Sequence, residues 1–136
     1  MAKRYLLDTN TVIAGIKGRQ SVLEALDRLK PGQIVLSSIV VGELLTGVMK
    51  SDHPKRSQRA YEMITSEMSI EVVDEVVGAN YARLRSILEA KGTPIGGNDT
   101  WIAAHGLALN AIVVTDNTRE FSRVPGLVLE NWIHRG

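Results

Sequence analysis

The chain has 136 residues, a formal net charge of +1, 44% hydrophobic residues and 23% charged residues. These values are typical of a single globular domain, and we predict one domain over residues 1–136. Cysteine is absent, which excludes disulfides and thiolate metal sites. The small net charge and the scarcity of aromatic residues (two Trp, three Tyr, one Phe) argue against a molecule-wide positive field and against a base-stacking platform.

Targeting and membrane segments are not evident in the sequence. The apolar run that follows the N-terminal basic pair is too short for the apolar region of a signal peptide. No stretch approaches the roughly 20 apolar residues that span a bilayer. We therefore expect a cytoplasmic protein without a membrane partner.

Strand-like and helix-like segments alternate along the chain. Short apolar runs predict buried strands at residues 4–8, 33–38, 69–73, 111–115 and 127–132. Helical spacing of apolar residues predicts helices at residues 21–29, 37–50, 56–68, 74–92 and 99–109. Because helices separate the strands, we predict an α/β fold, a three-layer α/β/α sandwich around a mainly parallel central sheet.

Several residues are predicted to begin, end or bury these helices. Ser21 is the predicted N-cap of the helix at 21–29, and Gly92 is predicted to end the helix at 74–92. Asn98 is predicted to cap the helix at 99–109, which leaves Asp99 free for another role. The buried face of the 74–92 helix is predicted to comprise Val77, Tyr81, Leu84, Ile87 and Leu88.

Four carboxylates fall at one edge of the predicted sheet. Asp8 and Asp116 each end a strand, Glu43 lies in the helix after the second strand, and Asp99 opens the helix that precedes the strand at 111–115. Each has an ordinary explanation: a turn for the strand-end acids, a solvated helix face or a helix N-terminus for the others. Ligands of open parallel sheets bind outside the carboxyl ends of the strands, so the coincidence favours one shared site.

The residue types at this edge indicate a hard metal ion. Clustered carboxylates repel one another, and a divalent cation removes that penalty. Oxygen ligands favour Mg²⁺, with Mn²⁺ as the alternative. The histidines at 53, 105 and 134 lack zinc-ligand spacing, and His105 is predicted to be structural or surface-exposed. Phosphate-cradling loops and serine-nucleophile motifs are absent from the sequence, which leaves phosphodiester hydrolysis as the chemistry that fits.

Four segments of the sequence resemble one known family. They are "LLDTNTVI", "SSIVVGELLTG", "IGGNDTWIAAHGLALNAIVVTDNTREF" and "VPGLVLENW", and together they cover nearly all of residues 5–132. They resemble PIN-domain ribonucleases, most closely the VapC toxins of bacterial VapBC toxin–antitoxin pairs. The resemblance implies Mg²⁺-dependent endoribonuclease activity, a homodimer, and inhibition by an antitoxin whose C-terminal segment lies across the active site.

The resemblance also implies roles for individual residues. Asp8 and Asp99 match the most dependable metal ligands of the family, and Glu43 matches the acid of its "GEL" motif. Asp116 is the fourth candidate, either as a ligand, as a group that supports a ligand, or as an acid without a role. Some family members carry Asn at that position, and others place the acid nearer to the phenylalanine. The polar groups expected to support the ligands are Thr9, Asn10, Thr115 and Asn117.

The substrate is predicted from the same resemblance and from basic residues. The "TREF" ending resembles the group of VapC toxins that cut initiator tRNA in its anticodon loop, which inhibits translation. Five basic residues are candidates for RNA phosphate contacts, with a solvated basic surface as the alternative. They are Lys50, Lys55, Arg56, Arg59 and Arg119.

Two other function classes remain as alternatives. One is a PIN-fold binding module that has lost its metal. The presence of Asp8, Glu43 and Asp99 argues against this alternative. The other is a phosphotransfer protein with an acidic pocket, either a receiver or a phosphatase. A phosphatase of this type needs a second acid two residues after the first, where this chain has Asn10.

Overall fold

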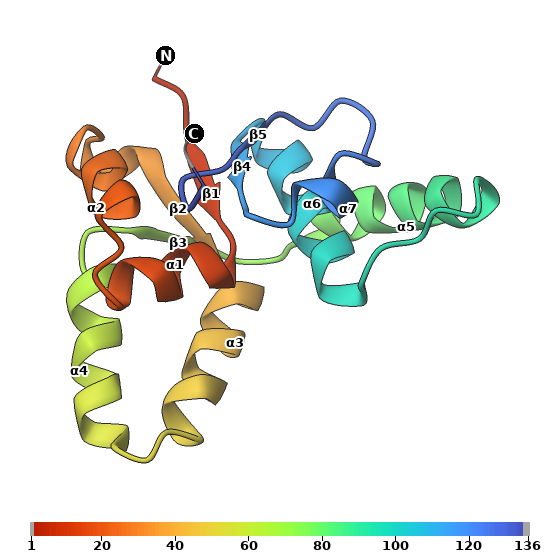
Figure 1. Cartoon of the computed structure of the whole chain (residues 1–136). Helices are drawn as coiled ribbons and strands as arrows, with labels where there is room; N and C mark the ends of the chain where they lie inside the picture. The colour runs from red at the N-terminus through yellow and green to blue at the C-terminus, as the bar shows by residue number, and fades with distance from the viewer. Residues whose placement is uncertain (1, 135–136) are drawn as a thin grey trace.

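The computed structural model describes residues 2–134, which form a central parallel sheet flanked by helices (Figure 1). The strands are β1 Tyr5–Leu7, β2 Ile34–Ser37, β3 Ser69–Glu71, β4 Ile112–Val114 and β5 Leu129–Glu130. The α-helices are α1 Thr9–Ile16, α2 Gln20–Asp27, α3 Ser38–Met49, α4 Pro54–Thr65, α5 Glu75–Ala90, α6 Gly97–Leu109 and α7 Thr118–Phe121. A short 3-10 helix, η1 Pro31–Gln33, precedes β2.

The sheet has the strand order β3-β2-β1-β4-β5, and every neighbouring pair is parallel. Leu6 of β1, at the centre, lies opposite Val35 of β2 and Val113 of β4. All three side chains are completely buried, because helices cover both faces of the sheet. Their continuous apolar runs are the pattern of strands in such a sheet, and the predicted α/β sandwich is confirmed.

The helices form the two outer layers of the sandwich. Helix α1 packs against α2, α3 and α4 on one face, while α5 packs along α6 on the other (Figure 1). The chain runs outward from β1 through β2 to β3, and then returns to β4 on the other side of β1. The reversal makes the β1–β4 boundary a topological switch point, the place where open α/β sheets bind ligands.

Close packing of α6 on the sheet depends on one glycine. A Cβ added to Gly106 would lie 2.5 Å from Val113 Cγ2 and 3.3 Å from Leu127 Cδ1. Only a residue without a side chain allows the helix to approach β4 this closely. The position of α6 matters for function because Asp99 lies in its first turn.

The helix ends differ from the predictions in several places. Ser21 is not an N-cap, because α2 begins one residue earlier and Arg19 occupies that position. Asn98 is not the cap of α6 either, since the helix already begins after Gly96. Helices α1 and α7 were not predicted, because both are short and neither shows clear apolar spacing. Gly92 does end α5, with a left-handed φ of 69°.

The predicted buried face of α5 is only partly correct. Val77, Leu84 and Leu88 are buried, whereas Ile87 is 36% exposed. Tyr81 is half-buried and stacks on Trp101 of α6, with ring centroids 3.8 Å apart and an interplanar angle of 13°. The apolar stripe is therefore narrower than predicted, because only one side of α5 faces α6.

Candidate active site

Asp8 lies directly after β1 at the switch point and is the N-cap of α1. Its Oδ1 accepts hydrogen bonds from the Thr11 backbone N (3.0 Å) and from Thr11 Oγ1 (2.8 Å). Burial raises the pKa of Asp8 above its ordinary value, hydrogen bonds from Thr115 and Thr11 partly offset the rise, and the charge of Asp116 adds to it. The turn expected for this residue is present, and the carboxylate is also buried at the edge where ligands bind.

Asp99 is half-buried in the first turn of α6. Its Oδ2 accepts a hydrogen bond from Asn117 Nδ2 at 3.3 Å, which links α6 to the segment after β4. Burial is the largest cause that raises the pKa of Asp99, followed by the negative charge of Glu120. The charges of Asp8 and Glu43 raise it further. Four carboxylates from separate parts of the chain therefore act on one another electrostatically.

Glu43 lies half-buried in α3 and is held by a residue of α1. Thr9 Oγ1 donates a hydrogen bond to Glu43 Oε1 at 2.9 Å. Thr9 immediately follows Asp8, so the start of α1 carries the Asp8 carboxylate and orients that of Glu43. The structure thus places Thr9 beside a candidate ligand, where its predicted supporting role requires it to be.

Asp116, Thr115 and Asn117 follow β4 on the same edge. Asn10 Nδ2 donates to Asp116 Oδ1 at 3.5 Å, a long contact between exposed groups. The buried Thr115 Oγ1 accepts a hydrogen bond from the Asn117 backbone N at 3.0 Å. All three lie at the predicted edge, and Asp116 lies on the Asp8 side of it.

The sequence analysis did not single out Glu120, which the structure adds to the site. It lies in the single-turn helix α7 directly before the buried Phe121, and it accepts a hydrogen bond from Asn117 Nδ2. That amide also donates to Asp99, so one side chain links two carboxylates. The family pattern that places an acid nearer to the phenylalanine was the available signal for this residue.

Among the described residues, the acids of this edge have no Lys or Arg partner. In the part of the chain that the structure describes, none of Asp8, Glu43, Asp99, Asp116 and Glu120 forms an ion pair with Lys or Arg. Within residues 2–134, no three His, Asp or Glu side chains lie close enough together to hold a metal ion as they stand. The edge is therefore acidic and partly exposed, and no described Lys or Arg side chain balances its negative charge. The acids offer a metal ion only oxygen ligands.

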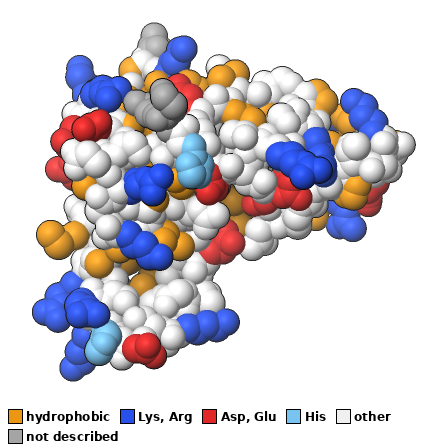
Figure 2. All heavy atoms as spheres, in the orientation of Figure 1, with side chains coloured by type: hydrophobic (Ala, Val, Ile, Leu, Met, Phe, Trp, Pro, Cys, Tyr) orange, Lys and Arg blue, Asp and Glu red, His pale blue; other side chains and the backbone are white. Residues whose placement is uncertain are grey.

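The predicted RNA contacts lie in two places. Lys55, Arg56 and Arg59 are exposed on α4, and Lys50 is exposed at the end of α3. They belong to the α3–α4 arm (residues 46–60), which projects from the sheet and carries Lys, Arg and His side chains at its far end (Figures 1 and 2). Arg119 is separate, because it lies on α7 beside Glu120.

A groove lies between α1, α3 and α4 and extends to Glu43. It has a volume of about 590 Å³. Its walls come from α1, α3 and α4 and are mostly apolar, with Ile13, Ile16, Leu44, Val48 and Tyr61 among them. Ile16 is 37% exposed, so the groove is open to a partner.

His105 was predicted to be structural or surface-exposed, and it is a buried structural residue. It is almost completely buried, and its Nδ1 lies 2.9 Å from Ser37 Oγ, the N-cap of α3. Burial lowers the pKa of His105 below its ordinary value, against the opposing charges of Asp74 and Glu71. The imidazole thus connects α6 to the start of α3.

The chain is similar to known proteins over nearly its whole length. The family model described as PIN domain matches residues 5–127. The chain is 36% identical to ribonuclease VapC1 of Haemophilus influenzae over 94% of its own length and 97% of that protein. It is 35% identical to the tRNA(fMet)-specific endonuclease VapC of Salmonella typhimurium, over 95% and 98% respectively.

A solved structure matches over the same range. The crystal structure of VapBC2 from Rickettsia felis, bound to a DNA fragment from the promoter, superposes with a TM-score of 0.88. The identity is 39%, over 94% of this chain and 98% of the matched one. Over residues 2–134, no helix has the length and apolar character that crossing a membrane requires.

Proposed function

We propose, from the premise that this chain belongs to the PIN-domain family and within it to the VapC ribonucleases, that it is a metal-dependent endoribonuclease toxin. Its nuclease class follows from that family. The metal, the ligands, the RNA target and the partner are the proposal. Mg²⁺ is the ion that the donor set suits best, with Mn²⁺ as the alternative.

The observation that carries the metal proposal is the unpaired acidic edge. Burial and mutual repulsion raise the pKa values of Asp8 and Asp99, and no described Lys or Arg side chain pairs with them. A fold keeps such a costly arrangement when a bound cation compensates it. We assign Asp8 and Asp99 as the principal ligands and Glu43 as the third, with Glu120 or Asp116 completing the set.

The chain itself positions the reacting groups. A bound Mg²⁺ would activate water and stabilise the charge of the cleaved phosphodiester. Thr9 orients Glu43, and the Asn117 amide donates to both Asp99 and Glu120 and so links them. Asp8 is held by the cap of α1 and therefore cannot swing away from the edge. Asn10 and Thr115 complete the polar surroundings.

The proposed substrate is tRNA, with the anticodon loop of initiator tRNA as the cleavage site. Support comes from the 35% identity to a relative named as a tRNA(fMet)-specific endonuclease. The exposed basic residues of the α3–α4 arm would contact phosphates of the folded RNA and fix its position. Cleavage there would stop translation in the cytoplasm.

The proposed partner is a VapB-type antitoxin. The matched structure from Rickettsia felis is a VapBC complex, and the apolar groove beside Glu43 offers a surface for an antitoxin segment. An occupant of this groove would lie next to the carboxylates and block them. We also propose a homodimer, and Ile70, Val72 and Val76 are exposed apolar side chains that a second copy would cover.

The central experiment is cleavage of purified tRNA by the wild type in Mg²⁺, in EDTA, and by Asp99→Asn. We expect cleavage only by the wild type in Mg²⁺. Asp27→Asn is the matched control, because Asp27 is an exposed acid at the end of α2. Equal cleavage in EDTA, or by Asp99→Asn, would contradict the metal proposal, and a wild type that binds RNA without cutting it would favour the metal-free binding module.

A further inference from the structure

A cavity of about 210 Å³ lies beside the first turn of α6, and no carboxylate of the edge is among its lining residues. Gly97 and Thr100 line it, while Asp99, between them in sequence, turns the other way to meet Asn117. A helix is about 10–12 Å across with its side chains, so the cavity and the acids are separated by roughly that distance. A strand of RNA bound at the acids would therefore reach the cavity with a neighbouring nucleotide.

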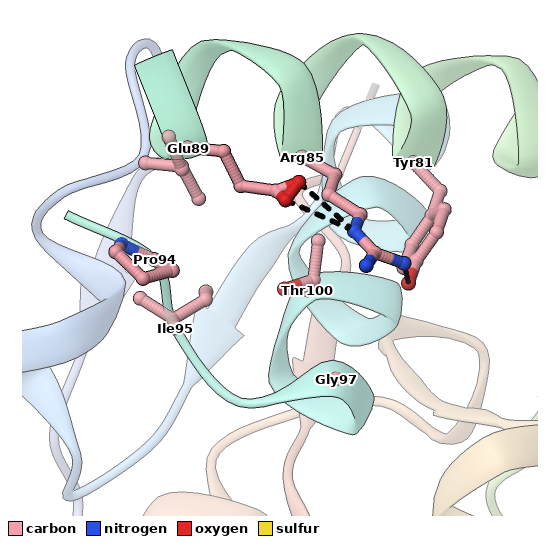
Figure 3. Close-up of a pocket in the computed structure, with 8 residues that line it drawn as sticks. Tyr81, Arg85, Glu89, Pro94, Ile95, Gly97 and Thr100 are labelled. Carbon is pink, nitrogen blue, oxygen red and sulfur yellow. Dashed lines mark hydrogen bonds and ion pairs between the residues drawn. The ribbon is translucent and has the colours of Figure 1, made fainter. Parts of the chain in front are cut away.

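The walls of the cavity combine flat, apolar and hydrogen-bonding surfaces (Figure 3). Tyr81, Arg85 and Glu89 line one side along α5, and Pro94 and Ile95 face them from the loop before α6. Arg85 Nε donates to Glu89 Oε1 at 3.3 Å, and Arg85 Nη1 donates to Tyr81 Oη at 3.2 Å. The guanidinium still has unused N–H groups, and Glu89 still has free lone pairs.

The cavity is formed before any ligand binds. The loop that makes its far wall is held at Pro94, whose carbonyl accepts a hydrogen bond from Arg123 Nη1 at 2.9 Å. The Thr93 backbone N also donates to the Leu88 carbonyl at 2.9 Å. On the other side, the stack of Tyr81 on Trp101 fixes the aromatic wall. Such preorganisation reduces the entropy cost of binding.

The size and chemistry of the cavity indicate its ligand. It is smaller than the roughly 300–1,000 Å³ of pockets that take drug-sized molecules. One planar heterocycle fits it, with Arg85 and Tyr81 as flat partners and the Arg85–Glu89 pair offering both donors and an acceptor. Proteins read unpaired RNA bases in this way, by stacking on aromatic or Arg groups and by hydrogen bonds to the base edges.

We propose that this cavity receives an unpaired base of the RNA strand, next to the phosphodiester that is cut, and that Arg85 and Glu89 select that base. The inference rests on the proposed ribonuclease function and adds to it a determinant of sequence preference. Neither residue belongs to the carboxylate edge, so base selection and cleavage can be separated by substitution.

The test uses Arg85→Met and Glu89→Gln, with Arg83→Met and Glu75→Gln as matched controls. All four residues are exposed on α5, and the control residues do not line the cavity. Each protein cuts a pool of RNA hairpins with randomised loop nucleotides, and the cut ends are sequenced. We expect the cavity variants to lose about tenfold discrimination at one loop position, while the controls keep the wild-type preference. Unchanged preference in both cavity variants, or no preference in the wild type, would overturn the proposal.

A binding measurement separates this proposal from the ribonuclease proposal. A loop oligoribonucleotide is added to ¹⁵N-labelled Asp99→Asn, and the NMR signals of Arg85 Nε and Trp101 Nε1 are followed. Shifted signals from a protein whose wild type cuts no RNA would support the base site and contradict the nuclease. Cleavage by the wild type with unshifted signals would contradict the base site and leave the nuclease intact.

Discussion

The carboxylate edge and the α3–α4 arm differ in the sign of their charged side chains and in how far these are exposed. At the edge, negative groups are buried or half-buried, and Thr9, Thr11 and Asn117 hold them by hydrogen bonds. On the arm, Lys55 and Arg59 are exposed, and Lys and Arg side chains gather at its far end (Figure 2). The edge is therefore suited to chemistry that needs fixed geometry, and the arm to contacts that need only charge.

The largest effect is expected from Asp8→Asn, which tests whether the edge acts through charge. Asn is as good an N-cap as Asp, so α1 and the fold should remain intact. RNA cleavage should fall at least about a hundredfold, because even the loss of a group that supports a metal ligand costs about 10–100-fold. Initial cleavage rates and thermal unfolding are measured together, with Asp52→Asn on the arm as the control. A variant that cuts RNA as fast as the wild type would remove Asp8 from the site.

The next effect distinguishes the two candidates for the fourth acid. We expect Glu120→Gln to lower the cleavage rate about 10–100-fold, and Asp116→Asn to lower it less. The charge of Glu120 acts on Asp99 more strongly than that of any other residue, and both accept hydrogen bonds from Asn117. Rates at several Mg²⁺ concentrations would show whether the loss comes from weaker metal binding. The reverse order of the two variants would assign the role to Asp116.

A smaller and different effect is expected when the arm loses its charges. In the triple variant Lys55→Ala, Arg56→Ala, Arg59→Ala, the slope of log affinity against log salt should decrease by about 2, since each phosphate contact to single-stranded RNA contributes roughly 0.7. Binding is measured in the Asp99→Asn background, so that the RNA stays intact. The control triple removes Arg28, Lys30 and Lys91, which are exposed away from the arm. An equal decrease of this slope in the control variant would mean that the total charge of the protein, and not the position of the arm, determines the salt dependence of RNA binding.

The smallest effect concerns stability of the metal-free edge as the pH rises. The pKa values of Asp8 and Asp99 are raised in the folded protein above the ordinary 3.8. Between 3.8 and the raised values the folded state binds more protons than the unfolded chain, so the free energy of unfolding falls as pH increases. We expect this fall in EDTA, and we expect Mg²⁺ or the double variant Asp8→Asn, Asp99→Asn to reduce it. Denaturant unfolding across that pH window measures it, and a wild-type fall no steeper than that of the double variant would contradict the account.

The strands and the positions of the first three acids could be predicted from sequence for a simple physical reason. A short apolar run such as that of β1 or β4, ended by polar residues, is typical of a strand buried on both faces, and its next residue then lies at the edge of the sheet. Asp8 was placed by this rule, and Asp99 was placed because it opens the helix that leads into β4. Their roles as ligands remain a prediction, because geometry alone does not test them.

The parts that were missed depend on contacts between distant segments. Asn98 has the right side chain for a cap, but the loop held by Arg123 delivers the chain so that α6 begins after Gly96. Glu120 belongs to the site only because Asn117 turns towards Asp99 across the gap between α7 and α6. Local sequence patterns do not report such long-range contacts, which is why the sequence analysis found the strand ends and did not single out Glu120.

The pairing of β1 with β4 has a consequence for protein synthesis. Asp8 leaves the ribosome well before Val114, whose carbonyl accepts a hydrogen bond from the Asp8 backbone N at 3.0 Å. A nascent chain therefore has no assembled edge until more than a hundred further residues have emerged and β4 has docked beside β1. The carboxylates come together only after β4 is in place, and we expect a nascent chain that still lacks β4 to have no nuclease activity.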